Sequence, residues 1–274
     1  MTKIGVALGG GGARGIAHVA VLQALEDLAP DAVSLAGTSI GALLGAAWAA
    51  GRRADEIREA LVRMVRAPDR AFYAPLGKLS WVTRLGIEWQ AGGLVDVSAF
   101  LGDWFEFVAT RRIEDLRHPL RIVAADFWER EEVVFESGDL ATAVRASMSL
   151  PAVFQPVVHD GRVLVDGGCV NPVPVDRLDD DCDVTIAVDV LGDRSHDPQE
   201  VPNVVEAVLN TFQIMEASIV REKLARRPPT ITIRPQTTDV DLLGFQHAER
   251  ILEETAPLRE EVREAVLRAT ARER

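Results

Sequence analysis

The feature that most constrains the fold is an alternation of apolar runs and glycine-rich turns within the first fifty residues. Residues 3–9 form an apolar run, the glycines of residues 9–12 follow it, and residues 16–28 carry apolar side chains at helical spacing. A second apolar run covers residues 32–36, and a helix of small residues over 40–50 follows a sharp turn. This order of strand, turn, helix and strand predicts βαβ units and a parallel sheet.

The rest of the chain continues the mixture of strands and helices. The patterns predict strands over residues 121–127, 132–136, 153–159, 162–165, 184–191 and 230–234. They predict helices over residues 52–68, 140–148, 204–227 and 246–271. Asp160-Gly161 separates two of the strands and is the two-residue signal of a β-hairpin.

The domain organisation follows from the absence of repeats, low-complexity segments and a clear linker. We expect one domain over residues 1–274, with an irregular cap or lid segment over about 69–98 and a helical C-terminal extension over about 246–274. The cap segment contains Trp81 and Trp89, which could enter a lipid interface or simply pack over the sheet edge.

Charge and composition exclude several classes of protein. A formal net charge of −12 argues against nucleic-acid binding and against electrostatic attachment to anionic lipid. Cys169 and Cys182 are too few for a disulfide framework and lack the spacing of a metal site. Apolar runs are too short for a transmembrane helix or a signal peptide. We expect a cytosolic protein without metal or other cofactor, which could touch the inner face of the membrane through an apolar patch.

The first glycine loop is compatible with more than one ligand. Residues 10–15 fit the G-x-G-x-x-G pattern of dinucleotide-binding folds, which also requires an acidic residue at the end of the second strand. That strand ends in Gly37-Thr38-Ser39, and the nearest acid, Asp31, precedes the strand. The Gly-Lys-Ser/Thr ending of a P-loop is absent as well. Both nucleotide-binding hypotheses are therefore disfavoured.

The second turn has the pattern of a nucleophile elbow. Gly37-x-Ser39-x-Gly41 lies between a strand and a helix, where the flanking glycines permit a sharp turn that raises the serine hydroxyl. Both loops leave the carboxyl ends of their strands, which is where open parallel sheets bind ligands. The glycine loop could then offer N–H groups to an oxyanion that forms when Ser39 attacks a carbonyl. The alternative is that the glycines only make a tight turn.

A serine nucleophile needs a base. The histidines at positions 18, 118, 159, 196 and 247 do not occupy marked turns at strand ends. Asp166 ends a predicted hairpin strand and is followed by Gly167-Gly168, so it could accept the Ser39 proton directly. An ordinary aspartate is a weak base and would need desolvation to act well. The alternative is a plain turn aspartate.

These segments together resemble the four sequence blocks of the patatin-like phospholipases. The blocks are Gly10-Gly11-Gly12-x-Arg14-Gly15, Gly37-x-Ser39-x-Gly41, Ala146-Ser147-x-x-x-Pro151-x-x-Phe154-x-Pro156 and Asp166-Gly167-Gly168, in the family's order. The resemblance covers roughly residues 3–190 and is closest to small bacterial members related to the neuropathy-target-esterase branch. It implies an α/β fold, a three-layer α/β/α sandwich with a mostly parallel central sheet, and no metal.

The resemblance also implies roles for particular residues. Ser39 and Asp166 would form a catalytic dyad, and backbone N–H groups of Gly10, Gly11 and Gly12 would form the oxyanion hole. Arg14 would hold this loop or contact a lipid phosphate, unless it only makes a local salt bridge. The block from Ala146 to Pro156, which includes Pro151 and Phe154, would form a wall of the site.

The sequence therefore predicts a serine lipid acyl hydrolase of phospholipase A, lysophospholipase or carboxylesterase type. Its partner would be a lipid or acyl-ester substrate, reached through a transient contact with a membrane surface. The alternative is a low-turnover regulatory or lipid-binding module on the same fold, and a nucleotide-dependent oxidoreductase is a more distant hypothesis. The sequence sets neither the headgroup nor the chain length nor the oligomeric state.

Overall fold

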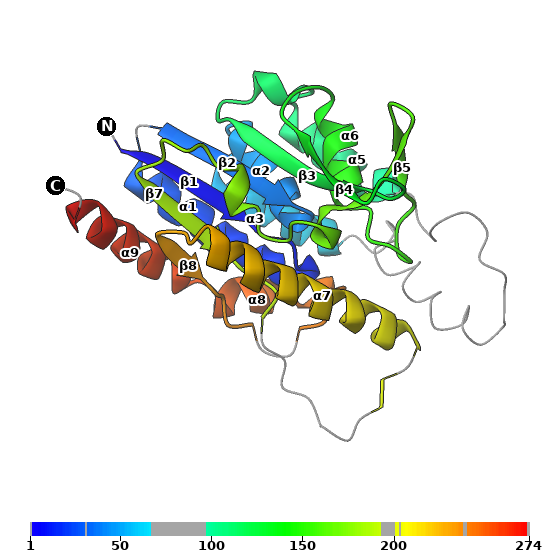
Figure 1. The fold of residues 1–274 in the computed structure, drawn as a ribbon. Coiled ribbons are helices and arrows are strands. Elements are labelled where there is room, and N and C mark those ends of the chain that lie inside the picture. The colour runs from blue at the N-terminus through cyan, green and yellow to red at the C-terminus, as the bar shows by residue number, and fades with distance from the viewer. Residues whose placement is uncertain are drawn as a thin grey trace.

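The structure is a computed structural model that describes residues 2–30, 32–66, 97–192, 201–202, 204–237 and 240–272. Its centre is an eight-stranded sheet in the order β5-β6-β3-β2-β1-β7-β8, with β4 also paired to β3 (Figure 1). The strands are β1 Lys3–Leu8, β2 Ala32–Thr38, β3 Leu120–Asp126, β4 Glu131–Phe135, β5 Val157–His159, β6 Arg162–Asp166, β7 Val184–Val188 and β8 Ile231–Ile233. The pairings among β1, β2, β3, β7 and β8 are parallel, and those of β4, β5 and β6 are antiparallel.

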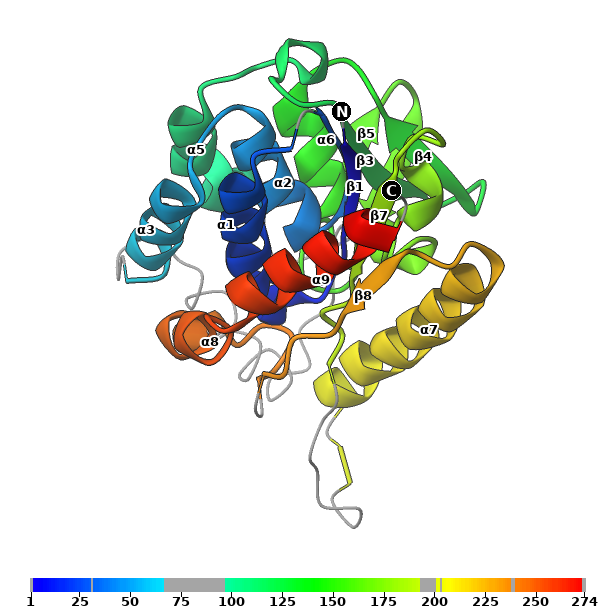
Figure 2. The ribbon, with the colours of Figure 1, turned by 90° about the vertical axis from the view of Figure 1, so that its left-hand side faces the viewer.

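Helices cover both faces of this sheet. They are α1 His18–Leu28, α2 Ile40–Ala49, α3 Ala54–Arg66, α5 Val97–Val108, α6 Leu140–Ser147, α7 Val204–Arg226, α8 Ala248–Glu254 and α9 Leu258–Arg272. Figure 2 shows α1, α2 and α3 on one side of the sheet and α7 on the other. The predicted three-layer α/β/α sandwich with a mostly parallel sheet is confirmed.

The strands place alternate side chains in the two layers, as a sheet covered on both faces requires. Ile4, Val6 and Leu8 of β1 belong to the large core cluster beneath α1 and α2. Ala7, between them, belongs to a smaller cluster that includes Val220 of α7. The larger core therefore lies on the α1 and α2 side of the sheet.

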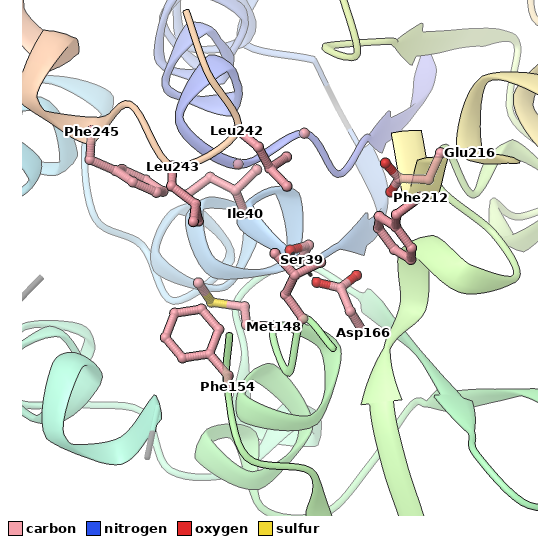
Figure 3. Close-up of a pocket in the computed structure, with 13 residues that line it drawn as sticks. Ser39, Ile40, Met148, Phe154, Asp166, Phe212, Glu216, Leu242, Leu243 and Phe245 are labelled. Atoms are coloured by element: carbon pink, nitrogen blue, oxygen red, sulfur yellow. Dashed lines mark hydrogen bonds between the residues drawn. The ribbon is translucent and has the colours of Figure 1, made fainter. Parts of the chain in front are cut away.

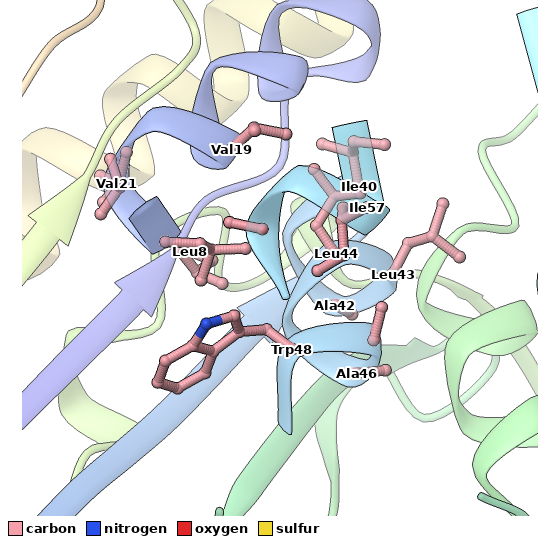
Figure 4. Close-up of a cluster of buried hydrophobic side chains, with 14 of the residues drawn as sticks. Leu8, Val19, Val21, Ile40, Ala42, Leu43, Leu44, Ala46, Trp48 and Ile57 are labelled. Atoms are coloured by element: carbon pink, nitrogen blue, oxygen red, sulfur yellow. The ribbon is translucent and has the colours of Figure 1, made fainter. Parts of the chain in front are cut away.

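The small residues of helix α2 are explained by its position in the core. All of its residues are buried, and Figure 4 shows Ala42, Leu43, Leu44, Ala46 and Trp48 within the core cluster. A helix that is apolar all round is one that is buried all round. Its alanines and glycines allow the backbone to approach the sheet closely, which fixes the helix directly behind the turn at Ser39.

Strand β3 brings two distant parts of the chain to one place. β2 pairs with the first half of β3, where Thr38 lies beside Val123. β6 pairs with the second half, where Asp166 lies beside Ala124. Since β4 pairs along both halves, it must occupy the opposite edge of β3, so β2 and β6 share one edge. The residue after Thr38 and the last residue of β6 therefore meet at the carboxyl end of β2.

Two predicted elements differ from the structure, and one helix was not predicted. The strand predicted over 153–159 is wrong for its first half, because Pro156 has no N–H to donate and the Phe154 N–H turns back to the carbonyl of Leu150 at 2.9 Å. The helix predicted over 246–271 breaks before Pro257 into α8 and α9. Helix α5 was not predicted, although Leu101, Trp104 and Val108 are buried at helical spacing.

One further prediction is confirmed, and two others concern residues that the structure does not describe. The hairpin at Asp160-Gly161 is confirmed, because both residues have positive φ, 48° and 75°, between the paired strands β5 and β6. Most of the cap segment predicted over 69–98, with Trp81 and Trp89, lies outside the described residues. His196 lies outside them as well.

Candidate active site

Ser39 occupies a strained turn between β2 and α2. Its φ of 55° and ψ of −123° lie in a region that residues with a side chain rarely adopt. A Cβ atom at Gly41 would overlap the carbonyl of Leu8, so the first turn of the helix can lie this close to β1 only with glycine there. The Ser39 N–H donates to Oγ of the buried Ser147 at 2.8 Å, which fixes the turn from the side of α6. The turn points the Ser39 hydroxyl into a pocket at the sheet edge.

Asp166 holds that hydroxyl. Ser39 Oγ donates to Asp166 Oδ2 at 2.7 Å, and the Gly168 N–H donates to Asp166 Oδ1 at 2.8 Å. The aspartate is only 3% exposed, and this burial raises its pKa to about 6, against the lowering effect of the two hydrogen bonds. At neutral pH the carboxylate is therefore ionised but basic enough to accept a proton from a hydroxyl in a reaction.

The glycine loop lies beside the pair, and its members differ in their hydrogen bonds. The Gly10 N–H donates to the carbonyl of Pro172 at 2.9 Å, and Gly10 does not line the pocket. Gly11 and Gly12 do line it. Within the described part of the chain no carbonyl accepts from either of their N–H groups. Of the three predicted donors, Gly11 and Gly12 therefore face the pocket and the Gly10 N–H is already bonded, whereas their role at an oxyanion stays a prediction.

Gly12 is required by the way the loop is packed. Its φ is 59°, and a Cβ atom there would overlap the carbonyl of Leu242. The next N–H, that of Ala13, donates to the same carbonyl at 2.9 Å. The segment around Leu242 thus holds the loop from above and fixes the direction of its N–H groups.

His18 supports the loop from within the core. It is fully buried, and its Nε2 lies 2.8 Å from the carbonyl of Gly9. Burial lowers the pKa of His18 to about 4, so the ring is neutral at neutral pH and its Nε2–H donates to Gly9. His18 is not among the residues that line the pocket with Ser39, and its contact with Gly9 makes it a structural residue at the base of the glycine loop.

Arg14 is also buried, beneath the glycine loop. It is not among the residues that line the pocket, and its Cδ lies 3.4 Å from where a Cβ atom of Gly192 would stand. Burial and the charge of Asp166 raise the pKa of Glu216, and the positive charge of Arg14 partly offsets this rise. Arg14 therefore lies outside the pocket wall, and both of its predicted roles stay predictions.

The pocket above Ser39 has mainly apolar walls. It holds about 460 Å³ of space between atoms, including space open to solvent. In Figure 3 most of the labelled apolar side chains gather on one side of Ser39, namely Ile40, Met148, Phe154, Leu242, Leu243 and Phe245. Phe212 and Glu216 of α7 lie on the other side, beyond Asp166. Of the predicted wall residues Phe154 lines the pocket and Pro151 does not.

Sequence patterns do not single out the walls contributed by α7 and by residues 242–245. Neither segment carries a motif, and both lie more than 40 residues beyond Asp166 in the sequence. The sequence signal for the second wall is only that Leu242, Leu243 and Phe245 are apolar and lie shortly before α8.

Among the described residues, no three His, Cys, Asp or Glu side chains are arranged to hold a metal ion. The described helices include none with the length and apolar character needed to span a bilayer.

The strain at Ser39 gives a first testable expectation. Ser39→Gly should be more stable than Ser39→Ala by about 1–2 kcal/mol, because both lack the hydroxyl and only alanine keeps a Cβ atom at φ 55°. Denaturant unfolding of both variants measures the difference. At Ser34, in the extended part of β2, the same pair of substitutions should show the opposite order, with glycine less stable. Equal stability of the two Ser39 variants would show that the turn is not strained.

Comparison with known proteins gives a family match. A family model described as patatin-like phospholipase matches residues 6–179. An uncharacterized NTE family protein of Mycobacterium tuberculosis is 33% identical over 231 residues, which cover 82% of this chain and 61% of that protein. The lysophospholipase nte1 of Aspergillus fumigatus is 32% identical over 197 residues, which cover 72% of this chain and 12% of that protein. The chain therefore spans less than two thirds of the length of these relatives.

A solved structure shares the fold. The crystal structure of VipD from Legionella pneumophila superimposes with a TM-score of 0.50 at 15% identity, and the match covers 96% of this chain and 67% of that one. At this level of identity the similarity concerns the arrangement of strands and helices.

Proposed function

Because the chain belongs to the patatin-like phospholipase family, we propose that it is a serine lipid acyl hydrolase with Ser39 as nucleophile and Asp166 as base. The observation that carries the proposal is the 2.7 Å hydrogen bond between Ser39 Oγ and Asp166 Oδ2 at the floor of an apolar pocket. Nucleophile and base within hydrogen-bond reach, next to free N–H donors, is the arrangement that acyl transfer requires.

The proposed reaction has two halves. Ser39 Oγ attacks the ester carbonyl as its proton passes to Asp166, and the N–H groups of Gly11 and Gly12 stabilise the oxyanion. The tetrahedral intermediate then expels the alcohol, which takes the proton from Asp166 and leaves an acyl-enzyme. Water attacks this ester while Asp166 accepts a proton, and the second collapse releases the fatty acid and returns the proton to Ser39.

The substrate class follows from the pocket walls. The apolar side next to Met148, Phe154 and Phe245 suits an acyl chain, since such a surface gains about 25 cal/mol for each Å² that it buries. We propose a phospholipid, a lysophospholipid or a simpler acyl ester as substrate. The name of the Aspergillus fumigatus relative, a lysophospholipase, supports this range.

Lipid substrates are presented in membranes or micelles. We propose that the region around the carboxyl end of β3 makes a transient contact with such a lipid surface. Phe127 and Trp128 directly follow the carboxyl end of β3, beside the pairing that holds Asp166, and they are 50% and 71% exposed. Tryptophan suits such a boundary because its ring is apolar and its N–H is polar. We further propose that residues 1–274 act as one hydrolase domain.

The test is the release of fatty acid by the purified protein. Lysophosphatidylcholine, a diacyl phospholipid, a monoacylglycerol and a p-nitrophenyl acyl ester are offered as monomers and as vesicles or micelles. We expect fatty acid from at least one of them, and a faster rate from aggregated than from monomeric lipid. If the lipids bind but no ester is cleaved, the protein is a lipid-binding module and the proposal fails. Equal rates in both physical states would remove the surface contact alone.

A further inference from the structure

Glu216 is a buried carboxyl group in the pocket that the proposed reaction does not use. It lies on α7, is 3% exposed, and lines the same pocket as Ser39 and Asp166. Its Oε2 is buried and has no hydrogen-bond partner among the described residues. A buried polar atom left without a partner costs about 1–3 kcal/mol, so a residue with such an atom in a ligand pocket is a candidate to meet the ligand.

Glu216 shares a small space with Asp166. A Cβ atom at Gly168 would overlap Glu216 Oε1 and would stand 3.1 Å from Asp166 Oδ1, so both carboxyl groups converge above this glycine. Burial and then the charge of Asp166 raise the pKa of Glu216 well above its ordinary value, with a lesser opposing effect of Arg14. Burial beside Asp166 therefore favours the protonated form of Glu216.

The position of Glu216 in the pocket separates it from the acyl wall. Figure 3 shows Glu216 on the opposite side of Ser39 from Met148, Phe154 and Phe245. When the acyl chain of an ester lies on the apolar side, the alcohol half extends to the other side, towards Glu216. Helix α7 is fixed there by Lys223, two turns further on, which contacts Glu132 at 3.4 Å and Asp176 at 3.1 Å.

We propose that Glu216 is a specificity-determining residue that hydrogen-bonds a hydroxyl group in the alcohol half of the substrate. This rests on the proposed function. A neutral carboxyl group offers one O–H donor and one acceptor oxygen, and a hydroxyl group can satisfy both. The substrates selected are acyl esters whose alcohol keeps a free hydroxyl close to the scissile bond, as in monoacylglycerols and monoacyl phospholipids. An ester without that hydroxyl leaves the buried carboxyl unsatisfied and is disfavoured.

The experiment compares two esters with the same acyl chain, a 1-monoacylglycerol and the corresponding propyl ester. The quantity measured is the ratio of their kcat/KM values, which cancels general effects of a substitution on activity. For the wild type we expect a ratio of about ten or more, since one satisfied hydrogen bond contributes about 1.4 kcal/mol. Glu216→Leu should bring the ratio close to one. Glu216→Gln keeps a donor and an acceptor and should keep most of the preference.

Met215→Ala is the matched control, because Met215 is the neighbouring residue on α7 and is 53% exposed. It should keep the wild-type ratio. A wild-type ratio near one, or a folded Glu216→Leu protein with the wild-type ratio, would overturn the role of Glu216 while leaving the proposed function intact. A wild type that cleaves neither ester but releases fatty acid from another of the lipids offered above would overturn this inference alone. Release of fatty acid from none of them would overturn the proposed function and this inference with it.

Discussion

Ser39→Ala is expected to lower kcat/KM for acyl-ester hydrolysis by about 10⁴- to 10⁶-fold, the loss typical of removing a serine nucleophile. The substitution removes the atom that forms the acyl-enzyme, whereas the pocket walls and the N–H groups of Gly11 and Gly12 stay in place. Substrate binding should therefore survive. The measurement is steady-state hydrolysis of a p-nitrophenyl acyl ester, with binding of a non-cleavable ether lipid measured in parallel.

Ser34→Ala is the matched control for this experiment. Ser34 is a second buried serine of β2, and its Oγ accepts from the N–H of Asp179 at 3.3 Å, towards the other end of the strand. This variant should keep its activity and lose about 1 kcal/mol of stability. A Ser39→Ala protein that retains a tenth or more of the wild-type activity would contradict the assignment of the nucleophile.

Asp166→Asn is expected to have opposite effects on activity and stability. The amide cannot accept the Ser39 proton, so kcat/KM should fall by about 10³- to 10⁴-fold. Stability should rise at neutral pH, because the wild-type protein keeps an ionised carboxylate in a buried place. Loss of function together with gain of stability is typical of a residue placed for catalysis rather than for folding.

The sign of the stability effect follows from the pKa of Asp166. Its pKa is raised to about 6 in the folded protein, from an ordinary value of 3.8, so the folded state binds the proton more tightly than the unfolded state. The stability that the folded state gains from binding this proton is fully present below the ordinary pKa of 3.8, and it is lost as the pH rises through about 6. Asp166→Asn should therefore gain about 2–3 kcal/mol relative to the wild type at pH 8, and little at pH 4.

Denaturant unfolding of the wild type and of Asp166→Asn at these two pH values measures the effect. Asp126→Ala is a useful comparison, because Asp126 is buried at the end of β3 and its Oδ1, which alanine lacks, caps the turn by accepting from the N–H of Trp128 at 3.0 Å. That substitution should destabilise the protein instead. A stability difference between wild type and Asp166→Asn that is the same at both pH values would contradict a raised pKa of Asp166.

The positions of Ser39 and Asp166 at strand ends were easier to predict from the sequence than the walls around them. Ser39 follows β2 between two glycines, and Asp166 ends β6 just before two glycines; local patterns of that kind can be recognised in the sequence alone. The contact between Ser39 and Asp166 could not be predicted from local sequence, because it depends on β3 pairing with both β2 and β6 along one edge. The glycine loop was predicted as a unit, but the bond from the Gly10 N–H to Pro172 depends on a tertiary contact.

The walls depend on packing that leaves no local pattern. Phe212 and Glu216 reach the pocket from α7, whose sequence shows little separation of apolar and polar faces. Leu242 reaches it from a segment without regular structure. Helix α5 was missed although its buried residues have helical spacing, because the preceding thirty residues show no pattern against which to set its start. The positions of these wall residues and the start of α5 therefore depend on tertiary contacts.

The central claim is that Asp166 activates Ser39 as a nucleophile, and covalent labelling tests it most directly. The wild type, Ser39→Ala and Asp166→Asn proteins are incubated with an alkyl fluorophosphonate, and intact mass and peptide mapping locate the adduct. We expect one adduct on Ser39 in the wild type, none in Ser39→Ala, and slow labelling in Asp166→Asn. No adduct on the folded wild-type protein, or an adduct on another residue, would contradict it.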